Sequence, residues 1–153
     1  MRVILQRVSR GEVRVAGEVV GRIAEGYVAL IGVERGDGDS DVAYICRKIL
    51  GLRLFPDDVR NLNQALGARA VLAISQFTLL ADLSRGLRPS FDRAADPAAA
   101  QSLYEAVIAG LRAAGVTVAT GVFGASMEVE LVNQGPVTIL LDSRLLDSRS
   151  VSK

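Results

Sequence analysis

The sequence contains no histidine among its 153 residues. This absence excludes the Ser-His-Asp and Cys-His arrangements that activate a nucleophile, and it excludes imidazole acid-base catalysis near neutral pH. It also excludes zinc sites that depend on histidine ligands. Any catalysis therefore has to come from hydroxyls, carboxylates, backbone groups or the substrate itself.

Cysteine and long apolar runs are also scarce. The single cysteine, Cys46, excludes an internal disulfide framework and a metal site built from clustered cysteines. No apolar run approaches the ~20 residues that cross a bilayer, and the opening residues, MRVILQRVSR, lack the pattern of a signal peptide. We therefore expect a cytoplasmic protein that uses no membrane, no metal and no cofactor.

Charge of one sign is not in excess, because 18 Lys and Arg face 17 Asp and Glu, for a net charge of +1. Bulk electrostatics therefore give no case for nucleic-acid binding. Nearly all of the positive charge is arginine, however, and its planar guanidinium suits phosphate, although an arginine-rich source genome gives the same bias. Half of the residues are hydrophobic, so the chain can bury the core of one domain without metal or disulfide support.

Alternating and periodic apolar residues predict the order of elements. Strands are expected at 2–8, 12–16, 18–23, 26–33, 52–55, 70–80, 116–121, 127–133 and 136–142. A helix is expected at 41–50, where Cys46 lies on the apolar stripe and so belongs to the core. A second helix is expected to begin at Pro97, with Asp96 as its N-cap, and to end at Gly115.

This order lacks regular βαβ alternation, which argues against an all-parallel sheet. It predicts an α+β fold: a single domain with curved, mostly antiparallel, barrel-like β-sheets and two packed helices. We expect the domain to cover residues 1–143. Residues 144–153 are rich in serine and arginine, and we expect them to form a flexible tail.

The segment SQFTLL, residues 75–80, carries three hydrogen-bonding side chains near the end of a hydrophobic strand. Period-two alternation would direct Gln76 and Thr78 to one face, with Ser75 and Phe77 on the other. Strand ends that feed long loops are where sites tend to be built. Ordinary strand hydroxyls give the same pattern, because threonine is a good β-former.

The loop RGLRPSF, residues 85–91, places Arg85 and Arg88 three residues apart with Phe91 close by. Such a loop can grip phosphate and stack a base, or it can be a solvated turn.

A Gly-Pro step interrupts the run LVNQGPVTILLD, residues 131–142, which otherwise has the pattern of a strand. Proline cannot donate a hydrogen bond to a β-ladder, so it belongs at an edge, at a bulge or at a strand start. An X-Pro bond is also the one peptide bond for which the cis form costs little. Gly135-Pro136 therefore marks a local irregularity of the kind that is kept at functional sites.

Several of these segments together resemble the D-aminoacyl-tRNA deacylases. The likeness runs through MRVILQRVSR, GVERGD, LGLRLF, SQFTLLAD, RGLRPSF, LYEAV and FGASMEVELVNQGPVT. Two motifs are specific to that family, SQFT at 75–78 and GPVT at 135–138. Their order and separation in this chain match the family.

The resemblance implies a homodimer that hydrolyses the ester between a D-amino acid, or glycine mischarged on tRNA(Ala), and the 3′-terminal adenosine of tRNA. It implies no DNA partner. In the family the Gly-Pro peptide is cis and enters the pocket of the other subunit, where its carbonyls exclude L side chains by collision. Carried over to this chain, the filter is Gly135 and Pro136, followed by Val137 and Thr138, and Arg7 braces it.

The resemblance also implies the remaining site residues. Ser75, Gln76, Phe77 and Thr78 would form the pocket floor, with the backbone of Phe77 and Thr78 polarising the ester carbonyl. Met127 and the loop with Arg85, Arg88 and Phe91 would lie near the adenosine and the tRNA backbone.

Two mechanisms remain open under this resemblance. In the first, the 2′-hydroxyl of the tRNA handles the proton, which suits a chain without histidine. In the second, Thr78 is a covalent nucleophile, but the sequence shows no neighbouring base to activate it.

Three departures from the family pattern concern the surroundings of these motifs. Gln134 replaces an acidic residue, Ser126 replaces an aspartate, and residues 61–66 match only loosely. We expect Gln134 and Ser126 to alter only the local bracing of the loop.

Three other functions also fit parts of the sequence. A non-catalytic RNA-binding module would bind aminoacyl-tRNA without cleaving it. A general esterase would cleave small amino esters with weak D/L preference. A structural dimer would have no activity to lose when Pro136 is replaced.

Overall fold

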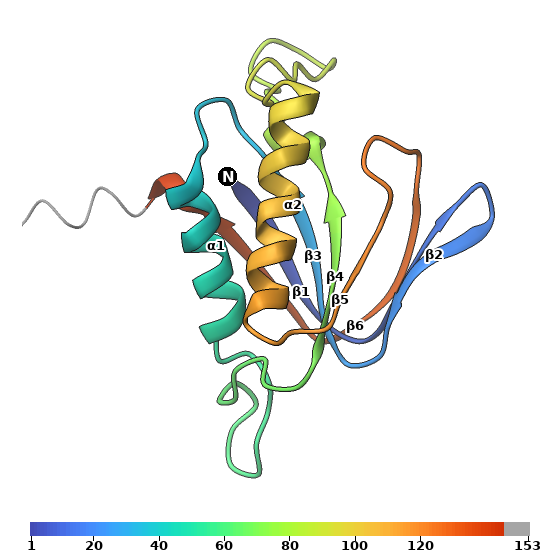
Figure 1. Ribbon diagram of the computed structural model, residues 1–153, viewed down its shortest axis with the longest axis vertical. Coiled ribbons are helices and arrows are strands. Elements are labelled where there is room, and N and C mark those ends of the chain that lie inside the picture. The colour runs from blue at the N-terminus through green and yellow to red at the C-terminus, as the bar shows by residue number, and fades with distance from the viewer. Residues whose placement is uncertain (146–153) are drawn as a thin grey trace, which may run out of the picture.

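A six-stranded sheet that curls strongly forms the centre of the molecule, and two helices cover one of its faces (Figure 1). The computed structural model describes residues 1–145. Of the predicted tail, 144–153, only residues 144 and 145 are described, and Arg144 pairs with Glu34 and Asp37, whereas residues 146–153 lie outside the described residues. The elements follow in the order β1 (Arg2–Val15), β2 (Glu18–Ile23), β3 (Gly26–Gly32), α1 (Asp39–Gly51), β4 (Ala70–Ser75), a 3₁₀ helix η1 (Phe77–Leu80), α2 (Pro97–Ala113), β5 (Val118–Thr120) and β6 (Glu128–Asp142). The predicted α+β class with two packed helices is confirmed.

The strands pair in the order β2-β1-β3-β4-β5, and β6 pairs with β1. The three pairings made by β1 are antiparallel, whereas β3–β4 and β4–β5 are parallel. A parallel pair needs a crossover connection, and α1 and α2 supply one each. The sequence analysis found both helices but missed these two crossovers.

The sheet curls until β2 approaches β5, which makes it barrel-like as expected. At this contact a Cβ on Gly21 would lie 2.4 Å from the carbonyl oxygen of Thr120. Only glycine allows two backbones to approach so closely.

Two long strands replace four short predicted ones. Residues 2–8 and 12–15 belong to the single strand β1, because β6 pairs along most of its length while β3 and β2 pair with its two halves. Residues 128–133 and 136–142 likewise belong to the single strand β6, so the predicted strands extended one residue too far at 16 and at 127. Backbone pairing with strands far away in the sequence keeps each strand continuous across a polar or irregular stretch.

Two other predicted strands are wrong in extent. Residues 52–55 form no strand, and only an isolated bridge joins Phe55 to Gln64. The strand predicted at 70–80 ends at Ser75, because the chain turns at Gln76 (φ −144°, ψ 78°) into η1. The apolar run continues through this turn, since Leu80 is buried, and hydrophobicity alone therefore did not show where the strand ends.

The helices bury apolar faces against the sheet. Ile45 and Ile49 of α1 and Val107 and Leu111 of α2 are fully buried in one core cluster. Cys46 packs against this cluster, and burial raises the pKa of its thiol. The prediction of a core cysteine is confirmed.

The ends of α2 follow the prediction only in part. Gly115 adopts a left-handed conformation (φ 85°), and Val116 N–H donates to the Leu111 carbonyl at 3.1 Å, a Schellman motif. Asp96 occupies the N-cap position, but its side chain makes no capping bond and lies 3.6 Å from Arg35 Nη2. Within residues 1–145 no helix is long and apolar enough to cross a membrane.

Candidate active site

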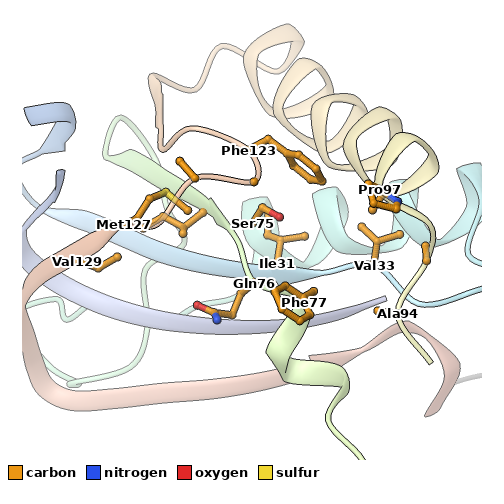
Figure 2. A pocket seen from close by; sticks show the side chains of 15 residues that line it. Ile31, Val33, Ser75, Gln76, Phe77, Ala94, Pro97, Phe123, Met127 and Val129 are labelled. Atoms are coloured by element: carbon orange, nitrogen blue, oxygen red, sulfur yellow. The ribbon is translucent and has the colours of Figure 1, made fainter. Parts of the chain in front are cut away.

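A cavity of about 460 Å³ lies where β3 and β4 end and α2 begins (Figure 2). Much of its lining is apolar, with Ile31, Val33, Ile74, Phe123, Met127 and Val129 among the contributors. Ala94, Ala95 and Pro97 close the side next to the start of α2. An apolar cavity of this size with few polar groups is typical of a small-molecule or nucleoside site.

The polar groups of this cavity come from the segment that follows β4. Ser75, Gln76 and Phe77 line it, and Figure 2 shows Ser75 between Phe123 and Ile31. Gln76 N–H donates to the Ile31 carbonyl at 2.7 Å, which anchors the segment to the end of β3. Three of the four predicted floor residues, together with Met127, are therefore brought together at one cavity.

Thr78 does not line the cavity and is exposed. Its hydroxyl accepts a hydrogen bond from Gln76 Nε2 at 2.5 Å. The predicted strand alternation at this point is wrong, because residues 77–80 form a helical turn. The turn, and not a shared strand face, brings the side chains of Gln76 and Thr78 together.

The start of η1 presents backbone donors beside the cavity. Phe77 and Thr78 are the first two residues of this helix, and the first N–H groups of a helix have no acceptor inside it. Since Phe77 itself lines the cavity, the start of η1 lies at its edge. Backbone N–H groups can polarise a carbonyl without any titratable side chain.

The loop after η1 contributes an aromatic ring beside the cavity. Phe91 packs edge-on against Phe77, with 4.9 Å between ring centroids. Asp82 and Ser90 pair through two backbone hydrogen bonds of 2.8 and 3.0 Å, which closes the loop between them. Arg85 and Arg88 lie in this closed loop, are exposed and do not line the cavity.

Gly135-Pro136 lies in a bulge of β6. Between two β1 residues, Gln6 and Val8, the partners on β6 run from Thr138 to Asn133, so five steps of β6 oppose two steps of β1. The Gly135-Pro136 peptide bond is cis, both residues are exposed, and neither lines the cavity of its own chain. The extra residues of the bulge accommodate a proline without breaking the strand.

Arg7 lies behind this bulge and is 6% exposed. Its guanidinium donates to the carbonyls of Leu54 at 2.6 Å, Asn61 at 3.0 Å and Gln134 at 3.2 Å. The expected contact between Arg7 and the Gly-Pro segment is thus present. The other two acceptors could not be predicted from the sequence, because every residue type carries the same backbone carbonyl.

Two of the three expected departures, Gln134 and Ser126, lie on the surface. Gln134 is exposed and meets Arg7 through its backbone carbonyl, so the identity of its side chain leaves that contact unchanged. Ser126 is exposed beside Met127. Across the bulge, Asn133 Nδ2 donates to the Thr138 hydroxyl at 2.9 Å.

Among residues 1–145, no group of three or more Cys, Asp or Glu side chains is placed to hold a metal ion. Burial raises the pKa of Tyr27, although the nearby Arg69 and Arg7 oppose that rise. Tyr27 belongs to the core and does not line the cavity.

The family model and the relatives that match this chain point to the same protein family. The family model described as D-Tyr-tRNA(Tyr) deacylase matches residues 4–142. A D-aminoacyl-tRNA deacylase of Anaeromyxobacter dehalogenans is 53% identical over 148 residues, which are 95% of this chain and 99% of that protein. Another, of Symbiobacterium thermophilum, is 52% identical over 145 residues, 94% and 96% of the two chains. A solved structure, c-Myc DNA Unwinding Element Binding Protein, has a TM-score of 0.81 at 32% identity and covers 93% of this chain and 98% of its own.

Proposed function

The chain belongs to the D-Tyr-tRNA(Tyr) deacylase family and is a D-aminoacyl-tRNA deacylase, and from this premise we propose that it releases D-amino acids and glycine from tRNA while rejecting L-aminoacyl esters. The observation that carries the proposal is the cavity of about 460 Å³ with Ser75, Gln76 and Phe77 at the end of β4. We propose that the enzyme acts in the cytoplasm with charged tRNA as its partner. The absence of a DNA partner stays a prediction.

The cavity is proposed to hold the terminal adenosine. Its largely apolar wall, which includes Met127 and Phe123, suits the flat face of a base. The ester would then lie at the start of η1, where Phe77 and Thr78 present backbone N–H groups. Arg85 and Arg88 are free to meet phosphates outside the cavity, and Phe91 supports Phe77 at its edge.

The chemistry is proposed to be substrate-assisted. An aminoacyl ester is already activated, so positioning and carbonyl polarisation supply much of the rate. Thr78 has only the side-chain amide of Gln76 as a hydrogen-bond partner at its hydroxyl among the described residues, and an amide cannot act as a base. The 2′-hydroxyl of the adenosine is therefore the preferred proton-handling group, and Thr78 as a nucleophile is the second candidate.

A tRNA that ends in 2′-deoxyadenosine tests the mechanism. Because the proposed proton-handling group is then missing, we expect deacylation of its D-aminoacyl ester to slow by about 100-fold or more. Single-turnover rates with the 2′-deoxy and normal substrates would measure this effect. Cleavage of the 2′-deoxy ester at the normal rate would exclude substrate assistance and would favour Thr78 as the nucleophile.

The chiral filter is proposed to act across a homodimer. Gly135 and Pro136 do not line the cavity of their own chain, so they can meet an ester only in a second copy. Among the described residues β6 pairs with β1 alone, which leaves its other edge without a partner strand. Val132 and Leu140 on this strand are 41% and 59% exposed. A long, partly apolar edge strand needs a cover, and a second copy provides one.

The dimer has a direct consequence for the mass in solution. We expect sedimentation equilibrium to give twice the mass of one chain at micromolar concentration. A charged residue at Leu140 should weaken this association, because it places a charge in the proposed interface. A monomer that retained full D-specific activity would contradict the cross-subunit filter.

The test of the function itself is deacylation of matched D- and L-tyrosyl-tRNA, with glycyl-tRNA(Ala) as a third substrate. We expect turnover of the D and glycyl esters and none of the L ester above the rate without enzyme. Binding without turnover would identify an RNA-binding module. Comparable cleavage of tRNA-free amino esters, with weak D/L preference, would identify a general esterase.

A further inference from the structure

Glu34 is a buried carboxylate just beyond the end of β3. Its side chain is 4% exposed and lies between two guanidinium groups. Oε1 accepts hydrogen bonds from Arg93 Nε at 2.7 Å and pairs with Arg93 Nη2 at 2.6 Å, and it also lies 3.1 Å from Arg144 Nη1. Oε2 is buried and has no hydrogen-bond partner among residues 1–145. A carboxylate desolvated to this degree depends on its charged partners to remain in place.

The backbone around Glu34 joins the same two segments. Glu34 forms an isolated bridge with Ala94, Arg35 N–H donates to the Arg93 carbonyl at 2.9 Å, and Ala95 N–H donates to the Val33 carbonyl at 3.0 Å. Val33, Ala94 and Ala95 all line the cavity, and Figure 2 shows Ala94 beside Val33. The segment around Glu34 therefore holds one wall of the cavity.

The side chain of Arg93 links the Glu34 carboxylate to this wall of the cavity. Arg93 immediately precedes Ala94 and comes at the end of the long connection between η1 and α2. The upstream part of this connection is closed on itself by the pairing of Asp82 with Ser90. The ion pair with Glu34 is thus one charged attachment of the wall to the end of β3, and the guanidinium of Arg35, which donates from Nε to the Ala94 carbonyl at 3.1 Å, is another. Arg144 approaches the Glu34 carboxylate from the segment after β6.

We propose that Glu34 is a positioning residue: through Arg93 it fixes the Ala94–Ala95 wall against the end of β3 and so sets the width of the cavity that receives the terminal adenosine. The inference rests on the proposed function of this cavity. Glu34 does not contact the reacting ester, so its loss should weaken substrate binding far more than it slows the chemical step.

The experiment compares kcat and KM for D-aminoacyl-tRNA among wild type, Glu34→Gln, Arg93→Ala, the double variant and Arg144→Ala. We expect each of the first two single variants to raise KM about tenfold with kcat within about threefold, and the double variant to raise KM no further. Arg144→Ala removes the other guanidinium from the same carboxylate, together with its contacts to the Arg35 carbonyl and Asp37, but it removes no contact to Ala94 or Ala95. Its KM should therefore stay within about twofold of wild type. Arg93→Lys keeps the charge and should restore much of the binding.

The salt dependence of KM separates this role from a direct contact between Arg93 and tRNA. Loss of a phosphate contact reduces the slope of log KM against log salt by about one, whereas loss of a positioning contact leaves the slope unchanged. The proposal is overturned if Arg93→Ala lowers the slope while Glu34→Gln leaves KM unchanged, if the two effects add, or if Arg144→Ala raises KM equally. If Glu34→Gln does not fold, the KM values of the Arg93 and Arg144 variants relative to wild type test the proposal on their own. Wild type that deacylates no D-aminoacyl-tRNA would instead refute the proposed function.

Discussion

Alanine at position 135 is expected to lower kcat/KM for D-aminoacyl-tRNA by about 100-fold and to bring the rates for D and L esters toward one another. Gly135 has φ 120°, a conformation that side chains other than glycine rarely adopt. A Cβ there would also lie 2.8 Å from Val137 Cγ2 and 2.9 Å from Arg7 Nη2. Both effects force the bulge to move, and a filter that works by collision loses selectivity when its carbonyls move.

Gly17→Ala is the matched control for this substitution. Gly17 also has a left-handed backbone (φ 83°), but no atom lies within 4 Å of the position of its Cβ. The control therefore carries the conformational cost, about 1 kcal/mol, without a clash and away from the cavity. Parallel melting curves and D/L rate ratios for both variants make the comparison. An unchanged D/L ratio in Gly135→Ala would remove Gly135 from the filter.

Lysine at position 7 is expected to destabilise the protein by about 3 kcal/mol and to reduce D-specific turnover as well. The guanidinium of Arg7 serves three backbone carbonyls in separate segments, at Leu54, Asn61 and Gln134. An ammonium group is a compact donor that cannot span these directions, so at least one buried carbonyl would lose its partner. The Gln134 carbonyl directly precedes the Gly-Pro step. Loss of its hydrogen bond to Arg7 would allow the bulge to move.

Arg10→Lys is the control for the arginine substitution. Arg10 lies on the same strand and pairs with Glu130 at 2.8 Å, with side chains that are 63% and 49% exposed. An exposed pair of this kind contributes little, so we expect a change below about 0.5 kcal/mol and unchanged turnover. Urea unfolding of the two variants, with turnover of D- and L-aminoacyl-tRNA, measures the difference. Equal stability of Arg7→Lys and wild type would show that the bulge needs no brace.

Local sequence patterns found the elements whose signals are contained in a short stretch. The second helix was recovered from Pro97 to its stop at Gly115, because the proline, the apolar spacing and the terminal glycine are local features. The core position of Cys46 followed from the same spacing. The Gly-Pro irregularity was visible because proline lacks a backbone donor in any context.

Strand limits depended on distant partners instead. Nothing within residues 2–15 distinguishes one long strand from two short ones, and only the pairing of β1 with β2, β3 and β6 settles it. The turn at Gln76 was hidden for the same reason, since its backbone bond goes to Ile31 of another strand. Thr78, which the resemblance placed in the pocket floor, lies outside the lining of the cavity.

The sequence by itself therefore determined the family, the α+β class, the segments proposed to carry the chemistry and the exclusion of imidazole catalysis. Only the tertiary structure decided which of those segments meet: Ser75, Gln76, Phe77 and Met127 line one cavity, whereas Gly135 and Pro136 lie apart from it in the same chain. It also revealed that the buried carboxylate of Glu34 pairs with the half-exposed Arg93. The physical reason is that contacts between residues far apart in the chain arise from packing and backbone pairing, which leave no periodic trace in either segment.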